Sequence, residues 1–492
     1  MTVMADDRAE SLATLFTTTR RLVVAEHLGV SHALCEQSDV PGIERMRAQG
    51  GAELLWASAE HPDMSAPSSR VCVGGSPGRP IFACVLDDRA TRQALPAVGS
   101  RWSRARDILG TDGQRIASIW RAHDGSVFLP FDPDEVCVNY WSERYLEIER
   151  DETRHRARRL MMQVYYRLRG AMPRAMQIWL RRQFARHQVR TRFPMWPAET
   201  ALHDFFDLFA SLLVEVAGEP VPRIAPWPHD RRWALVLTHD VERAGGMAAI
   251  DPIVELERGL TLRSSWNIVP RRYRVDVERL ERLAADGFEV GVHGLLHDGR
   301  DLESPTRMRE RLPGMRAAAA SWEAVGFRSP AMHRDWELMP QLGFDYDSSY
   351  PDSDPFEPQR GGCCTWLPYF NRELVELPMT MAQDHTLFVI LRHRDERAWV
   401  EKAELLRERG GMALIDTHPD YLVDRPAMDA YRALLERFAA DETAWKALPR
   451  DVSAWWRRRA ASRVERVDGS WTVTGPAATE ARVELMEGIA WR

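Results

Sequence analysis

The sequence lacks long apolar segments. No run of about 18 uncharged apolar residues occurs among the 492 residues, so we expect no membrane-spanning helix. The closest candidate, residues 205–217, includes Asp207 and Glu215 and fits a buried amphipathic helix better. The N-terminal residues are polar and acidic with no apolar stretch behind them, which predicts that no signal peptide is present.

Cysteine and excess positive charge are scarce as well. The six cysteines are irregularly spaced and form no C-x-x-C pair, which favours a reduced, cytoplasmic setting. A net charge of −6 gives no electrostatic reason to expect nucleic-acid binding. Apolar residues make up 45% and charged residues 28% of the chain, as in soluble globular proteins, and its length predicts two or three domains.

Residues 1–145 are expected to form a small mixed α/β module. Residues 11–34 carry helical periodicity, and turn-rich sequences separate two pairs of segments that predict β-hairpins. The paired segments are 70–74 with 80–86, and 115–121 with 126–130. No group of residues here indicates a chemistry, so the role of this module is left open.

Residues 146–228 are expected to form a helical connector followed by a linker. Between residues 153 and 192 the chain has twelve arginines and no acidic residue, and a break at Gly170 and Pro173 predicts two basic amphipathic helices. These arginines either pair with acidic surfaces of neighbouring domains or dock on an anionic membrane or a polyanionic glycan carrier. The prolines at 220–229 predict an extended linker.

Residues 229–445 alternate between strand-like and helix-like patterns, which predicts a (β/α) barrel or an open parallel sheet. Residues 446–492 are expected to form a helical and β-hairpin extension, with a D-G turn between its two strands. In the central region we expect strands from Trp233 and at 264–269, 288–292, 326–328, 374–377, 387–391 and 412–417, and helices at 250–260, 275–285, 308–325, 396–409 and 426–439.

Polar side chains gather where the first of these strands ends. The segment W-A-L-V-L-T-H-D-V-E starts at Trp233 as an apolar run that suits a strand buried on both faces, and it ends in Asp240 and Glu242. His293 and His297 follow a later predicted strand one helical turn apart, which is a metal-ligand spacing. Two histidines with one carboxylate, from Asp240 or Glu242, would leave coordination positions open for water.

Two further polar residues follow predicted strands of the same sheet. Arg328, in G-F-R-S-P-A, can orient a catalytic carboxylate through charge-assisted hydrogen bonds. His418, in L-I-D-T-H-P-D-Y, suits general acid catalysis near neutral pH. Asp416 and Asp420 lie two residues to either side of His418, and each is either its partner or only structural.

Residues 233–421 resemble the polysaccharide deacetylases, the carbohydrate esterases of family four. That family has the motifs T-F-D-D, H-x-x-x-H, R-x-P, D-x-S-x-Y/W and L-x-x-x-H in this order. The corresponding sequences here are T-H-D-V-E, His293 with His297, Arg328-Ser329-Pro330, Asp347 to Tyr350, and Leu414 to His418. Five motifs in the right order are far more specific than any one of them.

The resemblance implies a distorted (β/α) barrel and a divalent metal, commonly zinc, with cobalt, manganese or nickel as alternatives. It implies that Asp240 is the general base, that His418 is the general acid and that Arg328 tethers Asp240. The metal and a backbone N–H near Tyr350 would stabilise the oxyanion.

The sequence departs from the family pattern at two positions. Val241 replaces a metal-binding Asp, and we expect Glu242 to take its place beside His293 and His297, as in the D-V-D and D-V-E subgroup. Because side chains alternate in an extended segment, Asp240 and Glu242 can face one site while Val241 points away. Asp240 as the ligand, with a different base, stays an alternative. Met332 stands where the family has Gly, so the third loop is expected to differ in shape.

Residues 350–370 are irregular and rich in aromatic residues. Tyr350 and Trp366 are therefore candidates for substrate binding by ring stacking, with Trp366 and Phe370 as core residues in the alternative interpretation. Asp384 and His385 are either a pair that supports the site or an additional substrate contact.

The sequence therefore predicts a cytoplasmic, metal-dependent hydrolase that removes an N-acetyl group from an amino sugar or a surface-glycan precursor. A peripheral contact with the inner membrane face through residues 153–192 is a further expectation. One alternative is a C–N hydrolase of a small amide, formamide or ureide on the same fold. The other alternative is a metal-free, glycan-binding pseudoenzyme.

Overall fold

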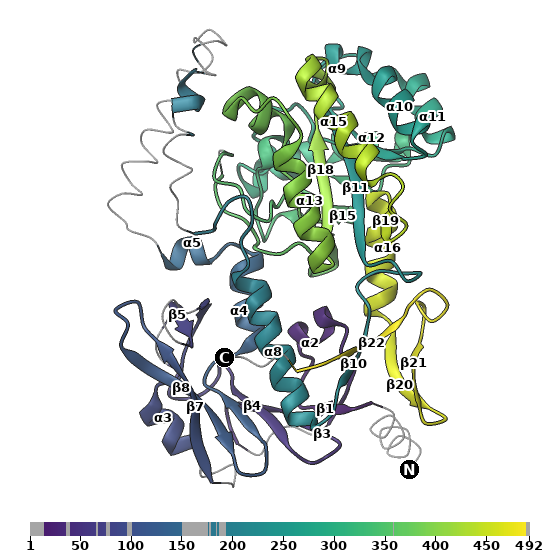
Figure 1. Ribbon diagram of the computed structural model, residues 1–492. Helices are drawn as coiled ribbons and strands as arrows, with labels where there is room; N and C mark the ends of the chain where they lie inside the picture. Colours follow the sequence, from purple (N-terminus) through teal and green to yellow (C-terminus); the bar gives the residue numbers. More distant parts are fainter. Residues whose placement is uncertain are drawn as a thin grey trace. The chain divides into compact units, whose positions relative to one another are not determined.

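The computed structural model describes residues 14–35, 40–64, 67–74, 79–95, 101–149, 176, 179–183, 185, 193–357 and 359–488. The chain forms two compact units, each discontinuous in sequence (Figure 1). The first unit comprises residues 1–150, 200–229 and 458–492, and the second comprises residues 151–199 and 230–457. Among the described helices, none combines the length and the apolarity that a membrane crossing requires.

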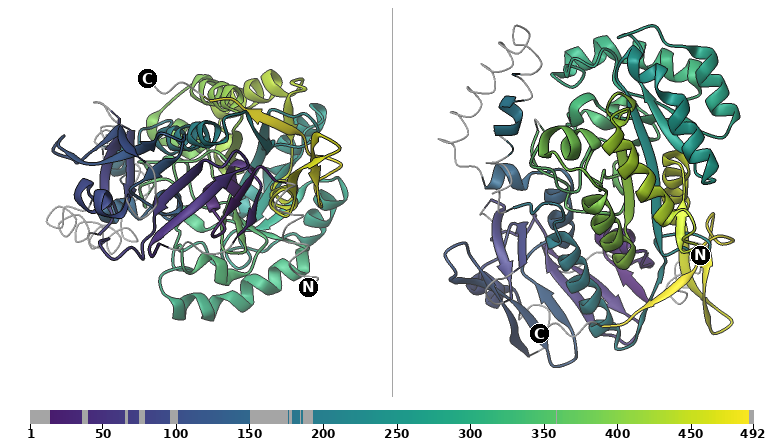
Figure 2. Two further views of the ribbon diagram at one scale, coloured as in Figure 1. Left: turned by 90° about the horizontal axis from the view of Figure 1, so that it is seen from below. Right: turned by 45° about the horizontal axis from the view of Figure 1, so that its top comes forward.

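The first unit is built on a nine-stranded mixed sheet with the order β2-β1-β3-β4-β9-β8-β7-β5-β6. Helix α8 (Ala201–Ala217) packs its apolar face against this sheet (Figure 2). The other elements of the sheet and its helices are β1 (Phe16–Thr18), α2 (Val23–Leu28), β2 (His32–Leu34), β3 (Ile43–Ala48), β4 (Glu53–Ala57), β5 (Ser69–Val73), β6 (Arg79–Ala83), α3 (Asp88–Ala94), β7 (Trp102–Leu109), β8 (Arg115–Ala122), β9 (Val127–Leu129), α4 (Pro133–Trp141) and α5 (Tyr145–Ile148).

Hairpin patterns identify strands of this unit better than helical periodicity does. Strands β5 and β6, and strands β8 and β9, pair antiparallel where the sequence predicts hairpins. The helix expected over residues 11–34 is wrong, because only α2 is helical and β1 and β2 flank it. The β-branched Thr17 and Thr18 favour the strand.

The C-terminal residues of the first unit are β-structured. Strands β20 (Arg463–Val467) and β21 (Ser470–Thr474) form a hairpin across Asp468 and Gly469, which both adopt the positive φ that a tight hairpin turn requires. The proline-rich segment expected as a linker contains β10 (Val221–Ile224), which pairs antiparallel with β22 (Val483–Met486). A two-stranded ladder tolerates Pro222 because each strand has a free edge.

The second unit contains a curled, mostly parallel sheet in a half-barrel arrangement. Its order is β16-β17-β15-β14-β13-β12-β11-β18, and only β16 runs antiparallel to its neighbour. The ladder ends at β18, to which the segment after β17 is linked by a hydrogen bond from Met381 N to Leu414 O (3.0 Å). The strands are β11 (Trp233–Val241), β12 (Ser264–Ile268), β13 (Glu289–Val292), β14 (Gly326–Phe327), β15 (Tyr346–Asp347), β16 (Tyr369–Asn371), β17 (Leu374–Glu376), β18 (Met412–Thr417) and β19 (Ala444–Lys446).

Helices cover the outer side of this sheet. Every residue of β11 and of β18 is buried, as expected for central parallel strands with apolar neighbours on both faces. Helix α13 packs against β18 and β11 (Figure 1). The helices are α9 (Ala244–Ala248), α10 (Ile250–Gly259), α11 (Val277–Ala285), α12 (Pro305–Trp322), α13 (Arg397–Arg409), α14 (Pro419–Leu422), α15 (Arg425–Phe438) and α16 (Pro449–Ala460), with short turns η2 (Pro330–Met332) and η3 (Met339–Leu342).

The strand expected at residues 387–391 is wrong. These residues belong to η4 (His385–Leu391), a π-helix that Asp384 caps by accepting a hydrogen bond from His385 N. A short continuous apolar run does not distinguish a buried strand from a buried helix. Because π-helices are rare and recur at functional sites, the position of η4 beside His418 has consequences described below.

The predicted basic helices of residues 153–192 lie mostly outside the described residues. Among those described, Arg181 lies 3.6 Å from Glu357, and Arg182 donates a hydrogen bond to Val389 O at 3.0 Å. Both partners belong to the same compact unit. These two arginines therefore contact their own unit and not a neighbouring one, and the role of the other arginines in this segment stays a prediction.

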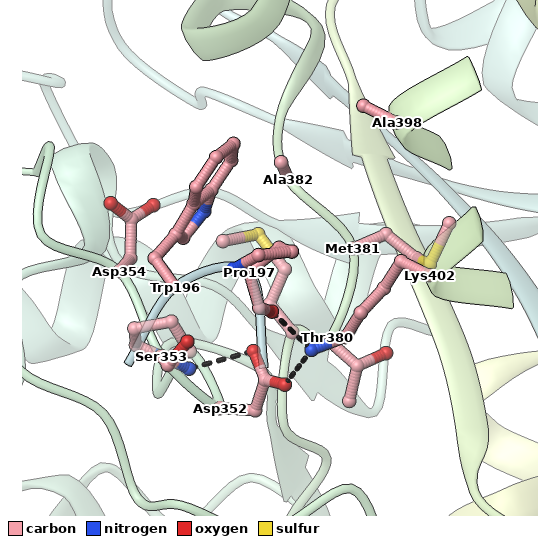
Figure 3. A pocket seen from close by; sticks show the side chains of 12 residues that line it. Trp196, Pro197, Asp352, Ser353, Asp354, Thr380, Met381, Ala382, Ala398 and Lys402 are labelled. Carbon is pink, nitrogen blue, oxygen red and sulfur yellow. Dashed lines mark hydrogen bonds and ion pairs between the residues drawn. The ribbon is translucent and has the colours of Figure 1, made fainter. Parts of the chain in front are cut away.

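A buried ion pair ties three segments of the second unit together. Lys402 of α13 donates hydrogen bonds to Pro197 O and to the carboxylate of Asp352, in a small cavity that Trp196 and Thr380 also line (Figure 3). Burial raises the pKa of Asp352 to about 6, and the Lys402 charge opposes this shift. Asp352 follows Tyr350 by two residues, so the pair anchors the irregular segment next to the predicted substrate residue.

Replacing Lys402 should destabilise the second unit. Lys402→Met leaves Asp352 buried without its cation, which we expect to cost about 3–5 kcal/mol in the free energy of unfolding measured by urea titration. Lys402→Met with Asp352→Asn should cost less, because no uncompensated charge remains buried. A single variant within about 0.5 kcal/mol of the wild type would show that the pair contributes little.

Candidate active site

Four parallel strands deliver their polar residues to one edge of the half-barrel. Asp240 and Glu242 come from the end of β11, and His293 and His297 follow β13. Arg328 and His418 follow β14 and β18 in the same way. These six predicted residues lie together in the structure, as the contacts described below show. Their grouping follows from topology, because the carboxyl ends of parallel strands meet at the same edge.

Glu242, His293 and His297 form one candidate metal-binding group. One ligand atom from each lies within 4.8 Å of the others. Glu242 Oε1 is 2.9 Å from His297 Nε2, and this buried nitrogen has no aligned hydrogen-bond partner among the described residues. Val241 lies in the hydrophobic core between its two acidic neighbours, in line with the expected alternation.

The protonation states of this group suit a cation. His293 Nδ1 is 3.0 Å from Arg328 O, and because a carbonyl can only accept, Nδ1 carries the proton and Nε2 keeps its lone pair. Burial lowers the pKa of His293 to about 4, so the ring is neutral at pH 7. Burial alone would raise the pKa of Glu242, but His297, His418 and His293 hold it well below its ordinary value. Two imidazoles and one carboxylate are a ligand set that fits a divalent ion such as zinc.

Asp240 lies beside this group and is held by two donors. Its Oδ1 accepts a hydrogen bond from Asn267 Nδ2 at 2.8 Å and lies 3.3 Å from Arg328 Nη1. Its Oδ2 is 3.6 Å from His293 Nε2. Burial works against ionisation, but His293, Arg328 and His418 lower the pKa of Asp240, so the carboxylate is charged. Asp240 is only 2% exposed, so its charge is poorly hydrated.

Arg328 is a fully buried guanidinium that contacts several segments at once. It donates to Thr238 Oγ1 at 2.8 Å, to Ser348 O at 2.9 Å and to Ser348 Oγ at 2.6 Å. Its Nη1 also lies 2.7 Å from Asp416 Oδ1, but without the alignment of a hydrogen bond. Burial and the nearby Asp240 raise the pKa of Asp416 well above its ordinary value.

Asp384 is the partner of His418 that sequence analysis could not assign. His418 Nδ1 lies 2.7 Å from Asp384 Oδ1, and His418 N donates to Asp384 Oδ2 at 2.8 Å. Although burial lowers the pKa of the His418 imidazole, Asp384, Asp416 and Glu242 together raise it well above its ordinary value. The free Nε2 lies 3.7 Å from Glu242 Oε1, on the side of the candidate metal group.

The two predicted substrate residues are buried. Tyr350 is 2% exposed and packs edge-on against Trp336 and Tyr369. Its N–H donates to Glu376 Oε1 at 2.9 Å, so the oxyanion donor expected near Tyr350 is already engaged. Trp366 is also 2% exposed and belongs to the hydrophobic core, as in the alternative interpretation. The geometry thus gives neither ring an open face for a substrate.

Met332 has the left-handed backbone that a glycine would adopt without strain. Its φ is 53°, that of Ala331 is 56°, and the Met332 side chain is buried. Two consecutive non-glycine residues in this region cost about 1–3 kcal/mol each. The loop after Arg328 therefore combines a strained backbone with a buried, large apolar side chain.

Comparisons with known proteins give structural likenesses only. No family model and no curated protein matches the chain. A putative polysaccharide deacetylase from Mycobacterium smegmatis is 19% identical, with 49% of this chain and 95% of that chain covered and a TM-score of 0.39. A probable polysaccharide deacetylase from Pseudomonas aeruginosa PAO1 is 16% identical, with 50% and 97% covered and a TM-score of 0.40. Puue allantoinase is 16% identical, with 50% and 96% covered and a TM-score of 0.39. At such values, function has to be argued from this chain's own residues.

Replacing Asp384 should change the pH dependence of the hydrolysis proposed below. Because its carboxylate raises the pKa of His418, Asp384→Asn should lower that pKa and move the alkaline limb of the kcat/KM profile down by about one pH unit or more. An acid group is lost as pH rises through its pKa, so the limb moves to lower pH. The exposed Asp395→Asn is the matched control and should leave the profile unchanged. If the alkaline limb of the Asp384→Asn profile stays where it is in the wild type, His418 is not the group that acts as the acid.

Proposed function

We propose that this chain is a metal-dependent hydrolase that removes the N-acetyl group from an amino sugar or a surface-glycan precursor. The proposal is carried by one observation. A Glu-His-His group lies beside an ionised aspartate and a histidine that a carboxylate holds, and these last two lie close to each other as well. A divalent metal held by Glu242, His293 and His297 would act as a Lewis acid that activates water and polarises the amide carbonyl.

Asp240 is the proposed general base. Its low pKa keeps it ionised, and Asn267 and Arg328 orient the carboxylate. Asp240 accepts a proton from the attacking water while the new carbon–oxygen bond forms at the acetyl carbonyl. Arg328 is a positioning residue in this scheme, because it is fully buried behind Asp240 and Asp416.

His418 is the proposed general acid. Asp384 holds its Nδ1 and keeps the ring protonated, which leaves the Nε2–H to donate to the amine when the carbon–nitrogen bond breaks. An ionised carboxylate and a protonated imidazole within one site are the pair that amide hydrolysis needs. The metal's identity, the cytoplasmic location and the membrane contact of residues 153–192 stay predictions.

The activity is tested with protein stripped of metal and reloaded with zinc, cobalt, manganese or nickel. We expect acetate release from N-acetylated sugars with at least one metal, and a loss of about 10²–10⁴-fold in kcat for Asp240→Asn. A panel of small amides, formamides and ureides is run in parallel. Product from this panel alone would favour the small-amide alternative. No bound metal and no hydrolysis under any condition would favour the pseudoenzyme.

Glu242 and Asp240 should separate metal binding from proton transfer. Glu242→Ala removes a proposed ligand and should weaken zinc binding by about 10–100-fold in a competition titration. Asp240→Asn should keep zinc binding within about twofold while lowering kcat about 10²–10⁴-fold, because its carboxylate is assigned to the water and not to the metal. The reverse pattern, with zinc affinity lost in Asp240→Asn and kept in Glu242→Ala, would exchange the two assignments.

A further inference from the structure

An arginine-rich loop borders the candidate metal group. Strand β12 ends at Ile268, and the chain continues as V-P-R-R-Y-R through residues 269–274. Arg271, Arg272 and Arg274 are exposed, whereas the intervening Tyr273 is half-buried.

Two hydrogen bonds hold this loop against both halves of the site. Arg271 N donates to Leu295 O at 3.0 Å, and Leu295 lies between the two candidate ligands His293 and His297. The Tyr273 hydroxyl donates to Val241 O at 2.6 Å, between Asp240 and Glu242. Tyr273 therefore anchors the loop to the end of β11, with an exposed arginine directly on each side of it.

These arginines form no ion pair among the residues that the structure describes, although the Glu242 and Asp420 carboxylates lie near enough to act on Tyr273. None of Arg271, Arg272 and Arg274 makes a side-chain hydrogen bond or an ion pair there, and neither does Arg243, which follows Glu242. Neighbouring arginines behave differently. Arg258 pairs with Asp286 in the same part of the unit. Exposed positive charge beside a binding site attracts and orients anions.

We propose that residues 271–274 bind the diphosphate of a glycosyl diphosphate substrate, next to the site where its N-acetyl sugar is hydrolysed; this assignment rests on the proposed function. Guanidinium groups bind phosphate oxygens in a bidentate manner, so several arginines suit a multiply charged diphosphate better than a single carboxylate. The diphosphate belongs to either a nucleotide or a lipid carrier, and both carriers present the same chemistry to this loop.

The test compares an anionic with a neutral substrate. The triple variant Arg271→Ala/Arg272→Ala/Arg274→Ala keeps Tyr273 and its anchor. The control variant Arg309→Ala/Arg409→Ala/Arg432→Ala removes the same charge from three exposed helical arginines. The probes are uridine diphosphate N-acetylglucosamine, farnesyl diphosphate-linked N-acetylglucosamine in detergent micelles, and the neutral methyl glycoside of N-acetylglucosamine.

We expect the triple variant to raise KM for both diphosphates at least about tenfold, with kcat and the kinetics on the neutral glycoside unchanged. The control variant should match the wild type. The carrier with the lower KM identifies the source of the diphosphate. Equal effects on the neutral and anionic substrates, or no effect on any of them, would overturn the proposal.

Binding alone separates this inference from the proposed activity. Uridine diphosphate N-acetylglucosamine is titrated calorimetrically into Asp240→Asn, with and without the triple substitution. A dissociation constant raised at least about tenfold by the triple substitution supports the diphosphate site even if no acetate is ever released. Unchanged binding, together with acetate release by the wild type, would overturn the diphosphate site and leave the proposed function standing.

Discussion

The site depends on one buried guanidinium, that of Arg328. Burying a charge costs several kcal/mol unless acids and acceptors compensate it. Here the ionised Asp240 supplies the opposite charge, Asp416 lies 2.7 Å away on β18, and Ser348 supplies two acceptors from the loop after β15. One side chain thereby links the ends of β11, β14 and β18. The backbone of Arg328 also orients His293, because Arg328 O accepts the hydrogen bond from Nδ1–H that fixes that ring's tautomer.

This shared cation also helps to keep neighbouring groups in different protonation states. Two carboxylates next to one guanidinium cannot both be fully compensated. The pKa of Asp240 falls while the pKa of Asp416, deeper and with fewer donors, rises. Pairing with Asp384 raises the pKa of His418, so that this ring keeps its proton, whereas burial keeps His293 neutral. Base, acid and ligand chemistry therefore become possible within one small region without any unusual residue type.

The grouping at the strand ends was predictable, because buried apolar runs followed by polar residues determine where parallel strands stop. Glu242 and His297 lie together at these strand ends, as expected, although a valine interrupts the usual motif. Contacts distant in sequence were not predictable, and the clearest case is Asp384, which reaches His418 from the cap of a π-helix that resembles a strand in composition. Burial was misjudged for Tyr350 and Trp366, since aromatic residues in an irregular segment suit a core as well as a binding wall.

The most direct test is anomalous diffraction at the zinc absorption edge from crystals of the zinc-loaded protein. The account predicts one strong peak about 2.0–2.2 Å from a Glu242 oxygen, His293 Nε2 and His297 Nε2, with Asp240 outside that shell. A peak bound instead by the neighbouring group of Asp240, Asp416 and His418 would contradict the account. So would the absence of any peak from protein saturated with zinc.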